Sequence, residues 1–127
     1  MGRPGLTFDT GALIALQRRK QRMSAVFAAA NRQGITITVP TVAIAEWWRG
    51  TAVRRADLLL AAVTVEPLSL DLSKAAGEAQ AAVPGATAID AIVMASAAQR
   101  GDIVYTSDPE DLTAMQSHFP GVRVLRA

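Results

Sequence analysis

Four acidic residues stand in apolar or junction settings, where a charged side chain needs a physical reason. They are Asp9 in LTF-Asp-TGALIAL, Glu46 in TVAIA-Glu-WW, Asp90 in ATAI-Asp-AIVM and Asp108 in VYTS-Asp-PED. An unpaired buried carboxylate is costly, so such groups usually cap a helix, pair with a base or bind a cation. Clustered carboxylates repel one another unless a cation neutralises them, and an all-oxygen site favours Mg²⁺ or Mn²⁺. The four acids together therefore indicate a divalent-metal site that activates water for attack on a phosphodiester.

Each acid also has a purely structural interpretation. Asp9 and Asp108 could each cap the N-terminus of the helix that comes next. Thr87 and Asp90 have the spacing of a capping box, in which each residue satisfies a backbone N–H near the start of a helix. Glu46 could lie on a solvent-exposed helix stripe with Arg49. The functional interpretation gains weight because all four acids occur together in such settings.

The composition excludes several other kinds of hydrolytic site. The chain has no cysteine, so thiolate metal sites, cysteine nucleophiles and disulfides are absent, and a single histidine disfavours a His-based metal cage or a Ser-His-Asp triad. At 127 residues, half of them hydrophobic, we expect one domain spanning residues 1–127. Asp9 interrupts the first apolar run, and later runs are shorter than the roughly 20 residues of a membrane helix. We therefore expect a cytoplasmic protein.

Charge is distributed unevenly along the chain. Residues 1–55 hold nine Lys or Arg and two acids, whereas residues 56–127 hold four and nine. Such asymmetry indicates a basic face for an anionic partner, either nucleic acid or an acidic protein. Four bases, Arg18, Arg19, Lys20 and Arg22, fall together between two predicted helices. We expect them to contact RNA phosphates, with an acidic protein partner or a solvated loop as alternatives.

The pattern of apolar runs, glycines and prolines predicts alternating strands and helices. Strands are predicted at 5–8, 35–39, 63–67, 103–106 and 122–125, and helices at 11–18, 23–33, 40–48, 53–62, 72–83, 87–100 and 109–117. Strands separated by helices predict an α/β fold with a mainly parallel sheet covered on both faces. Ligands of such sheets bind beyond the carboxyl ends of the strands, where Asp9 and Asp108 fall.

Four segments together resemble a known nuclease family. They are Phe8–Leu13 (FDTGAL), Pro40–Glu46 (PTVAIAE), Ile89–Ala91 (IDA) and Tyr105–Leu112 (YTSDPEDL). In this order they are similar to the motifs of PIN-domain ribonucleases and, more narrowly, of the VapC toxins of bacterial toxin–antitoxin pairs. The resemblance covers essentially the whole chain. It implies a PIN-like three-layer α/β/α domain with a mainly parallel central sheet.

The resemblance also implies roles for particular residues. Asp9, Glu46, Asp90 and Asp108 would converge in one pocket and bind Mg²⁺ or Mn²⁺, with Asp9 and Asp90 as the surest ligands. Thr10 and Thr106 would orient carboxylates through their hydroxyls. Asp111 would be an outer-sphere carboxylate, which supports the metal ligands without contacting the ion, or would serve only as a charge near the start of a helix. The chain departs from the family at Gly11, where relatives often carry Ser.

An activity and partners are implied by the same resemblance. It implies a Mg²⁺-dependent endoribonuclease toxin that cleaves RNA, often tRNA or rRNA, to leave a 5′-phosphate and a 3′-hydroxyl. Family members are usually homodimers and are silenced by a cognate VapB-like antitoxin. The alternative is a catalytically silent PIN-like module that binds RNA or protein; such proteins typically lose one or more acids, and this chain keeps all four.

Two classes of protein outside this family also place acids at strand ends. A receiver-like domain needs paired acids after its first strand and a lysine after its last, and the chain does not supply them. A phosphatase of the Asp-x-Asp type is disfavoured because Gly11 occupies the second Asp position.

Overall fold

A parallel sheet lies at the centre of the computed structural model, which describes residues 4–50 and 54–127. In that part of the chain the strands are β1 (Leu6–Phe8), β2 (Ile37–Pro40), β3 (Thr64–Glu66), β4 (Ile103–Thr106) and β5 (Arg123–Arg126). Their order across the sheet is β3-β2-β1-β4-β5, and every neighbouring pair is parallel. The predicted α/β fold is confirmed. Because β1 and β4 are parallel neighbours, their carboxyl ends lie side by side at the same edge of the sheet.

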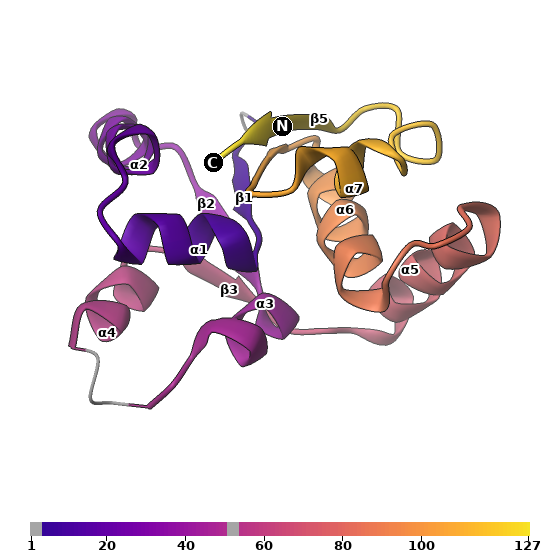
Figure 1. Cartoon of the computed structure of the whole chain (residues 1–127), viewed down its shortest axis with the longest axis horizontal. Helices are drawn as coiled ribbons and strands as arrows, with labels where there is room; N and C mark the ends of the chain where they lie inside the picture. Colours follow the sequence, from indigo (N-terminus) through magenta and orange to yellow (C-terminus); the bar gives the residue numbers. More distant parts are fainter. Residues whose placement is uncertain (1–3, 51–53) are drawn as a thin grey trace.

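Helices cover both faces of this sheet. They are α1 (Thr10–Gln17), α2 (Gln21–Gln33), α3 (Thr41–Trp47), α4 (Arg54–Ala61), α5 (Leu70–Ala82), α6 (Ala88–Arg100) and α7 (Pro109–Thr113). Figure 1 shows α1, α2 and α4 gathered on one side and α5 and α6 on the other. No helix of the described chain is both long and apolar enough to span a membrane.

Two buried clusters, one on each side of the sheet, hold these layers together. The first joins Phe8 and Val39 of the strands to residues of α1, α2, α3 and α4, and the second joins Val104 to residues of α5, α6 and α7. All three residues of β1 are buried, as expected for a central strand of a parallel sheet with both faces covered. This burial fixes the end of β1, and with it the position of Asp9.

A polar network joins Asp102, which precedes β4, to β1 and to the end of β3. The carboxylate of Asp102, only 2% exposed, accepts hydrogen bonds from the Gly5 amide at 2.8 Å and from the Thr7 hydroxyl at 2.9 Å. The Arg100 guanidinium donates to the same carboxylate at 2.8 Å and to Glu66 at 3.0 Å. Every charge in the network therefore has a partner, which a buried carboxylate requires.

The predicted elements lie within two residues of their expected bounds, except for the last predicted helix. The predicted start of the fourth helix, Val53, lies outside the described residues. The prediction of a helix over 109–117 is wrong at its end, because α7 stops at Thr113 and continues into turns with hydrogen bonds from residue i+3 to residue i. His118 lies in the exposed turn that follows and packs edge-on against Phe119.

Candidate active site

A cavity of about 190 Å³ opens at the carboxyl ends of β1 and β4, and we call it the acidic cavity. Five acids line it: Asp9, Glu46, Asp90, Asp108 and Asp111. The remaining lining residues are Thr10, Gly11, Ile89, Thr106 and Ser107, so no lysine or arginine is among the described residues that form its wall. The chain thus brings together all four acids expected to bind a metal, as well as Thr10, Thr106 and Asp111.

Asp9 comes directly after β1 and begins α1. Its carboxylate accepts a hydrogen bond from the Ala12 amide at 2.9 Å, so it does cap the helix, as its structural interpretation predicts. Burial raises the pKa of Asp9 to about 6, and the charges of Asp90 and Asp108 add to this rise, while hydrogen bonds with Thr106 and Ala12 oppose it. The capping bond uses the Oδ1 oxygen. Capping and a role in the cavity are therefore compatible.

Asp90 lies in the first turn of α6. The Thr87 hydroxyl accepts a hydrogen bond from the Asp90 amide at 3.2 Å, as in a capping box. Burial raises the pKa of the Asp90 carboxyl, a hydrogen bond with Thr87 lowers it, and the charges of Asp111, Glu46 and Asp108 raise it further. The mutual repulsion expected of a carboxylate cluster is thus felt at both Asp9 and Asp90.

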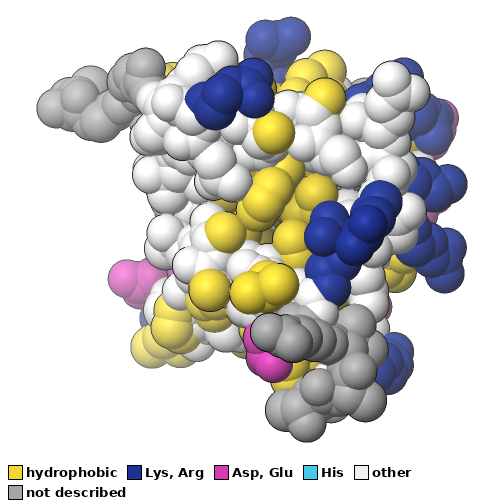
Figure 2. All heavy atoms as spheres, turned by 90° about the vertical axis from the view of Figure 1, so that its left-hand side faces the viewer, with side chains coloured by type: hydrophobic (Ala, Val, Ile, Leu, Met, Phe, Trp, Pro, Cys, Tyr) yellow, Lys and Arg dark blue, Asp and Glu magenta, His cyan; other side chains and the backbone are white. Residues whose placement is uncertain are grey.

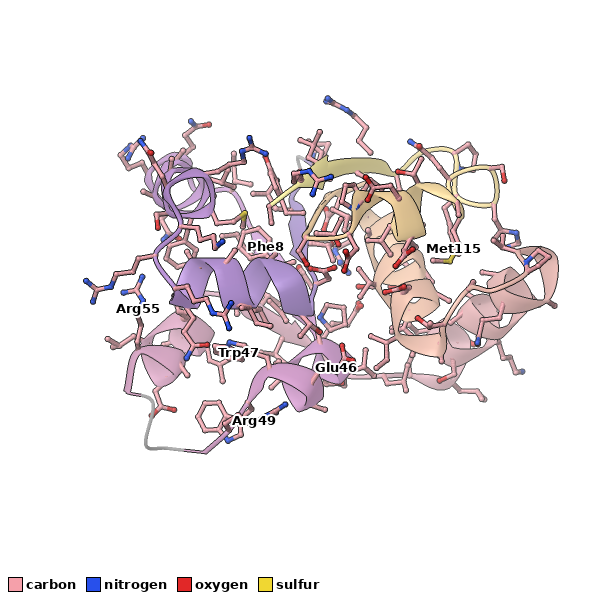
Figure 3. All side chains as sticks on the ribbon, viewed as in Figure 1. Phe8, Glu46, Trp47, Arg49, Arg55 and Met115 are labelled. Atoms are coloured by element: carbon pink, nitrogen blue, oxygen red, sulfur yellow. The ribbon has the colours of Figure 1, made fainter. Side chains whose placement is uncertain are left out.

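Glu46 enters the cavity from α3. The Thr10 hydroxyl donates to Glu46 Oε1 at 2.6 Å, which ties the end of α3 to the start of α1. Arg49 does not lie with Glu46 on a paired surface stripe, because its guanidinium donates to the Trp48 carbonyl at 2.7 Å. Figure 3 shows the two side chains pointing in different directions.

Asp108 occupies the N-cap position of α7, but its carboxylate makes no capping hydrogen bond. Its amide donates instead to the Thr106 hydroxyl at 3.0 Å, which fixes the backbone of the β4–α7 connection. Helix capping therefore does not account for the Asp108 side chain. The Thr106 hydroxyl, which is buried, serves both this amide and the Asp9 carboxylate.

The departure at Gly11 has a steric explanation. A Cβ atom on Gly11 would lie 1.9 Å from Ser107 Oγ and 2.7 Å from Ser107 Cβ. The space that a side chain at position 11 would fill is thus taken by the hydroxymethyl group of Ser107, which enters from the β4–α7 connection. Sequence reasoning did not identify Ser107, because no local pattern links positions 11 and 107.

The donor set of the acidic cavity fits a hard divalent cation in kind and in number. Carboxylate and hydroxyl oxygens are the groups that Mg²⁺ and Mn²⁺ prefer, and the neighbouring negative charges would be neutralised by such an ion. In their observed conformations, no three acidic or histidine side chains of the described residues are close enough together to coordinate one ion. Coordination of one ion would therefore require the carboxylates of the cavity to move closer together.

A second cavity, of about 420 Å³, adjoins the first, and we call it the basic cavity. Arg18, Lys20 and Arg126 supply its charged side chains, and Gly11 and Ser107 line both cavities. Arg126 was not identified from the sequence, since only the pairing of β5 beside β4 brings it to this edge of the sheet.

The other two bases of the run 18–22, Arg19 and Arg22, do not line the basic cavity. Arg22 donates to the carbonyl of Arg126 at 3.5 Å, so its position supports the end of β5. Arg19 is exposed and has a left-handed backbone conformation with φ 57°. The structure therefore separates Arg18 and Lys20, which face the cavity, from Arg19 and Arg22 of the same run.

Comparisons with known proteins agree with the fold. A family model described as the PIN domain matches residues 6–115. The DNA-bound VapBC structure from Salmonella typhimurium superimposes with a TM-score of 0.72 at 14% identity, covering 98% of both chains. VapBC2 from Rickettsia felis, bound to a promoter DNA fragment, gives a TM-score of 0.75 at 10% identity, covering 96% of this chain and 98% of that one. A toxin–antitoxin complex from Klebsiella pneumoniae gives 0.72 at 19% identity, covering 93% and 95%. No curated protein sequence matches the chain.

Proposed function

The chain belongs to the PIN-domain family, and from that premise we propose that it is a metal-dependent endoribonuclease, the toxin of a toxin–antitoxin pair. One observation carries the proposal: five carboxylates, without a lysine or arginine among the described lining residues, surround one cavity at the carboxyl ends of parallel strands. A silent relative has no need to keep such mutually repelling groups, whose burial opposes folding unless a cation is bound.

Asp9, Glu46, Asp90 and Asp108 are the residues that would hold the ion, Mg²⁺ or Mn²⁺. When bound, the ion would lower the pKa of water and stabilise charge on the phosphate under attack. The chain's own hydroxyls prepare the ligands: Thr10 holds the Glu46 carboxylate, and Thr106 hydrogen-bonds with Asp9. This arrangement reduces the conformational freedom that the ligands lose on binding.

The negative charge of Asp111 acts both on the dipole of α7 and on the acidic cavity. Asp111 lies in the first turn of α7, where a negative charge interacts favourably with the helix dipole, and it also lines the acidic cavity. Its charge helps to raise the pKa of the Asp90 carboxyl. In the proposed enzyme Asp111 therefore acts through Asp90, and its position in α7 does not exclude that role.

RNA is the proposed substrate, and tRNA or rRNA the proposed target class. Figure 2 shows Lys and Arg side chains at the top and along the right-hand side of one face of the molecule, around hydrophobic side chains at its centre, and these bases would attract a polyanion. Arg18, Arg19, Lys20 and Arg22 would contribute phosphate contacts there, which add affinity without sequence information. Cleavage by activated water would leave a 5′-phosphate and a 3′-hydroxyl.

A VapB-like antitoxin and a second copy of the chain are the proposed protein partners, and the cytoplasm is the proposed location. The similar solved structures include VapBC and toxin–antitoxin complexes, which supports a protein partner for this chain.

Cleavage of a structured RNA by purified protein tests the proposed activity. We expect cleavage with Mg²⁺ or Mn²⁺, none with EDTA, and a loss of at least about a hundredfold in Asp9→Asn and Asp90→Asn. Asp71→Asn is the matched control, because Asp71 stands in the first turn of α5 as Asp90 does in α6, yet lies outside the cavity. Cleavage that persists in EDTA, or products ending in a 2′,3′-cyclic phosphate, would contradict the mechanism; RNA binding without cleavage would favour the silent module.

A further inference from the structure

The acidic and basic cavities meet at a wall formed by Gly11 and Ser107. Both residues line both cavities, and Gly11 brings no side chain to the wall. Ser107 is exposed, so its hydroxyl is available to a ligand at the boundary. A ligand group in one cavity would therefore be separated from a group in the other by little more than one hydroxymethyl side chain.

Arg126 links the two cavities through its hydrogen bonds. Its guanidinium donates to the Ser107 carbonyl at 3.3 Å and to Glu110 Oε1 at 3.2 Å. Arg126 and Glu110 are 53% and 77% exposed, and an ion pair this open to water is weak. The guanidinium has five N–H donors, so it can bind a phosphate while it keeps its bond to Ser107.

From this juxtaposition we propose that Arg18, Lys20 and Arg126 bind one phosphate of the RNA strand, next to the phosphate that is cleaved over the acidic cavity. The proposal rests on the proposed nuclease function, which places the scissile phosphate beside the Gly11–Ser107 wall. A nucleic acid strand carries a phosphate at every nucleotide, so two neighbouring phosphates can occupy two adjoining cavities. Guanidinium, ammonium and hydroxyl groups are the donors that proteins use for such contacts.

The basic cavity also resolves an electrostatic difficulty of the proposed site. Five carboxylates repel an approaching polyanion until a cation neutralises them. Three bases on the other side of the shared wall would offset this repulsion and hold the strand. Within the basic run of residues 18–22, only Arg18 and Lys20 line this cavity and so belong to the proposed phosphate site.

Salt-dependent RNA binding in EDTA tests the proposal without requiring cleavage or metal. A labelled single-stranded RNA of mixed sequence is titrated by fluorescence anisotropy over a series of KCl concentrations. The test variant replaces Arg18, Lys20 and Arg126 with alanine. The control variant replaces Arg32, Lys74 and Arg123, three exposed bases outside the basic cavity, so both variants lose the same charge. Lys20→Gln, a single exposed change, provides a milder second variant.

The salt slope distinguishes one bound phosphate from several. One phosphate contact on a single strand contributes about 0.7 to the slope of log Kobs against log salt. We expect the test variant to lose about 0.7 and to bind roughly ten- to a hundredfold more weakly, with a smaller loss in Lys20→Gln and no slope change in the control. A loss near three times 0.7 would mean three separate phosphates and would overturn the proposal.

Unchanged binding in the test variant, or an equal loss in the control, would also overturn it. Failure of the subsite and failure of the enzyme are distinguishable, because the cleavage assay and the binding assay are separate. If the protein cleaves RNA and the slope does not change, only the subsite is wrong. If the slope changes as expected and no metal supports cleavage, only the nuclease function is wrong. Retained RNA affinity with lost affinity for a polyglutamate peptide would assign the basic cavity to an acidic protein partner.

Discussion

At the scale of single residues, Asp9 makes stability depend on pH. Its pKa is about 6 in the folded chain and 3.8 by reference when unfolded, so the folded protein holds the proton more tightly. Between these values the unfolded state ionises first, and folding stability therefore falls as pH rises towards 6 and levels off above it. The contribution is at most about 3 kcal/mol.

Asp9→Asn should remove this dependence. Asparagine retains an oxygen for the Ala12 amide, so the helix cap survives. In EDTA, we expect the free energy of unfolding of the variant minus that of wild type to grow from about pH 4 to pH 6 and then stay constant. Urea melts across this range measure it. A difference that does not change with pH would show that burial does not hold the proton on Asp9.

A second residue-scale prediction concerns the contact between Gly11 and Ser107. Gly11→Ala would force Ser107 to shift, because the added Cβ would lie 1.9 Å from Oγ and 2.7 Å from Cβ of that residue. We expect destabilisation of roughly 1–3 kcal/mol, as in other overpacked sites. The double variant Gly11→Ala/Ser107→Gly should recover most of this loss, since it removes the obstructing side chain.

Gly77→Ala controls for the general effect of replacing a helical glycine. Gly77 lies within α5, and a Cβ there would meet no atom within 4 Å. We expect this change to stabilise the protein by about 0.5–1 kcal/mol through helix propensity. If Gly11→Ala were as stabilising as Gly77→Ala, the close approach of Ser107 would be refuted.

At the scale of elements, two helices of equal length begin with comparable caps but differ in the residues that these caps hold. Ser69 accepts from the Leu72 amide at 3.1 Å at the start of α5, and Thr87 accepts from the Asp90 amide at 3.2 Å at the start of α6. Thr87 also hydrogen-bonds with the Asp90 carboxylate. Only the second cap therefore holds a residue of the acidic cavity.

Alanine at these two positions should separate stability from metal binding. We expect Ser69→Ala and Thr87→Ala each to lower the free energy of unfolding by about 1 kcal/mol. Thr87→Ala alone should also weaken Mn²⁺ binding, by roughly tenfold, because Asp90 loses an orienting partner. Thermal melts and calorimetric Mn²⁺ titrations measure the two effects. Equal Mn²⁺ affinity in both variants would mean that the α6 cap does not position a ligand.

At the scale of the whole molecule, the acidic cavity should make folding depend on metal. A ligand that binds only the folded state stabilises it by about 2.7 kcal/mol at a hundred times its dissociation constant. We expect Mn²⁺ to raise the melting temperature of wild type and of Asp71→Asn. Asp9→Asn and Asp90→Asn should melt at or above wild type in EDTA, because repulsion is relieved, and should gain less from Mn²⁺. Equal Mn²⁺-induced shifts in all four proteins would mean that Asp9 and Asp90 do not bind the ion.

Much of the architecture can be predicted from local patterns in the sequence. Apolar β-branched runs, cap residues and glycine stops act over a few residues, so they placed the strands and most helices without knowledge of the rest of the chain. The alternation of strands and helices then restricted the sheet to parallel pairing. The end of α7 at Thr113 was not predictable in this way, because no glycine or proline interrupts the pattern between Pro109 and Pro120.

The acidic residues of the site were also recognisable from the sequence, because a carboxylate in an apolar run stands out locally. The tertiary structure alone decided how these residues are used. Asp9 both caps α1 and lines the cavity, and the Asp108 side chain does not cap α7. Glu46 accepts a hydrogen bond from Thr10 and does not pair with Arg49. It also brought Ser107 against Gly11 and Arg126 beside the basic run. These contacts join segments far apart in the chain, and they depend on the lateral order and register of the strands, which no local pattern of residues encodes.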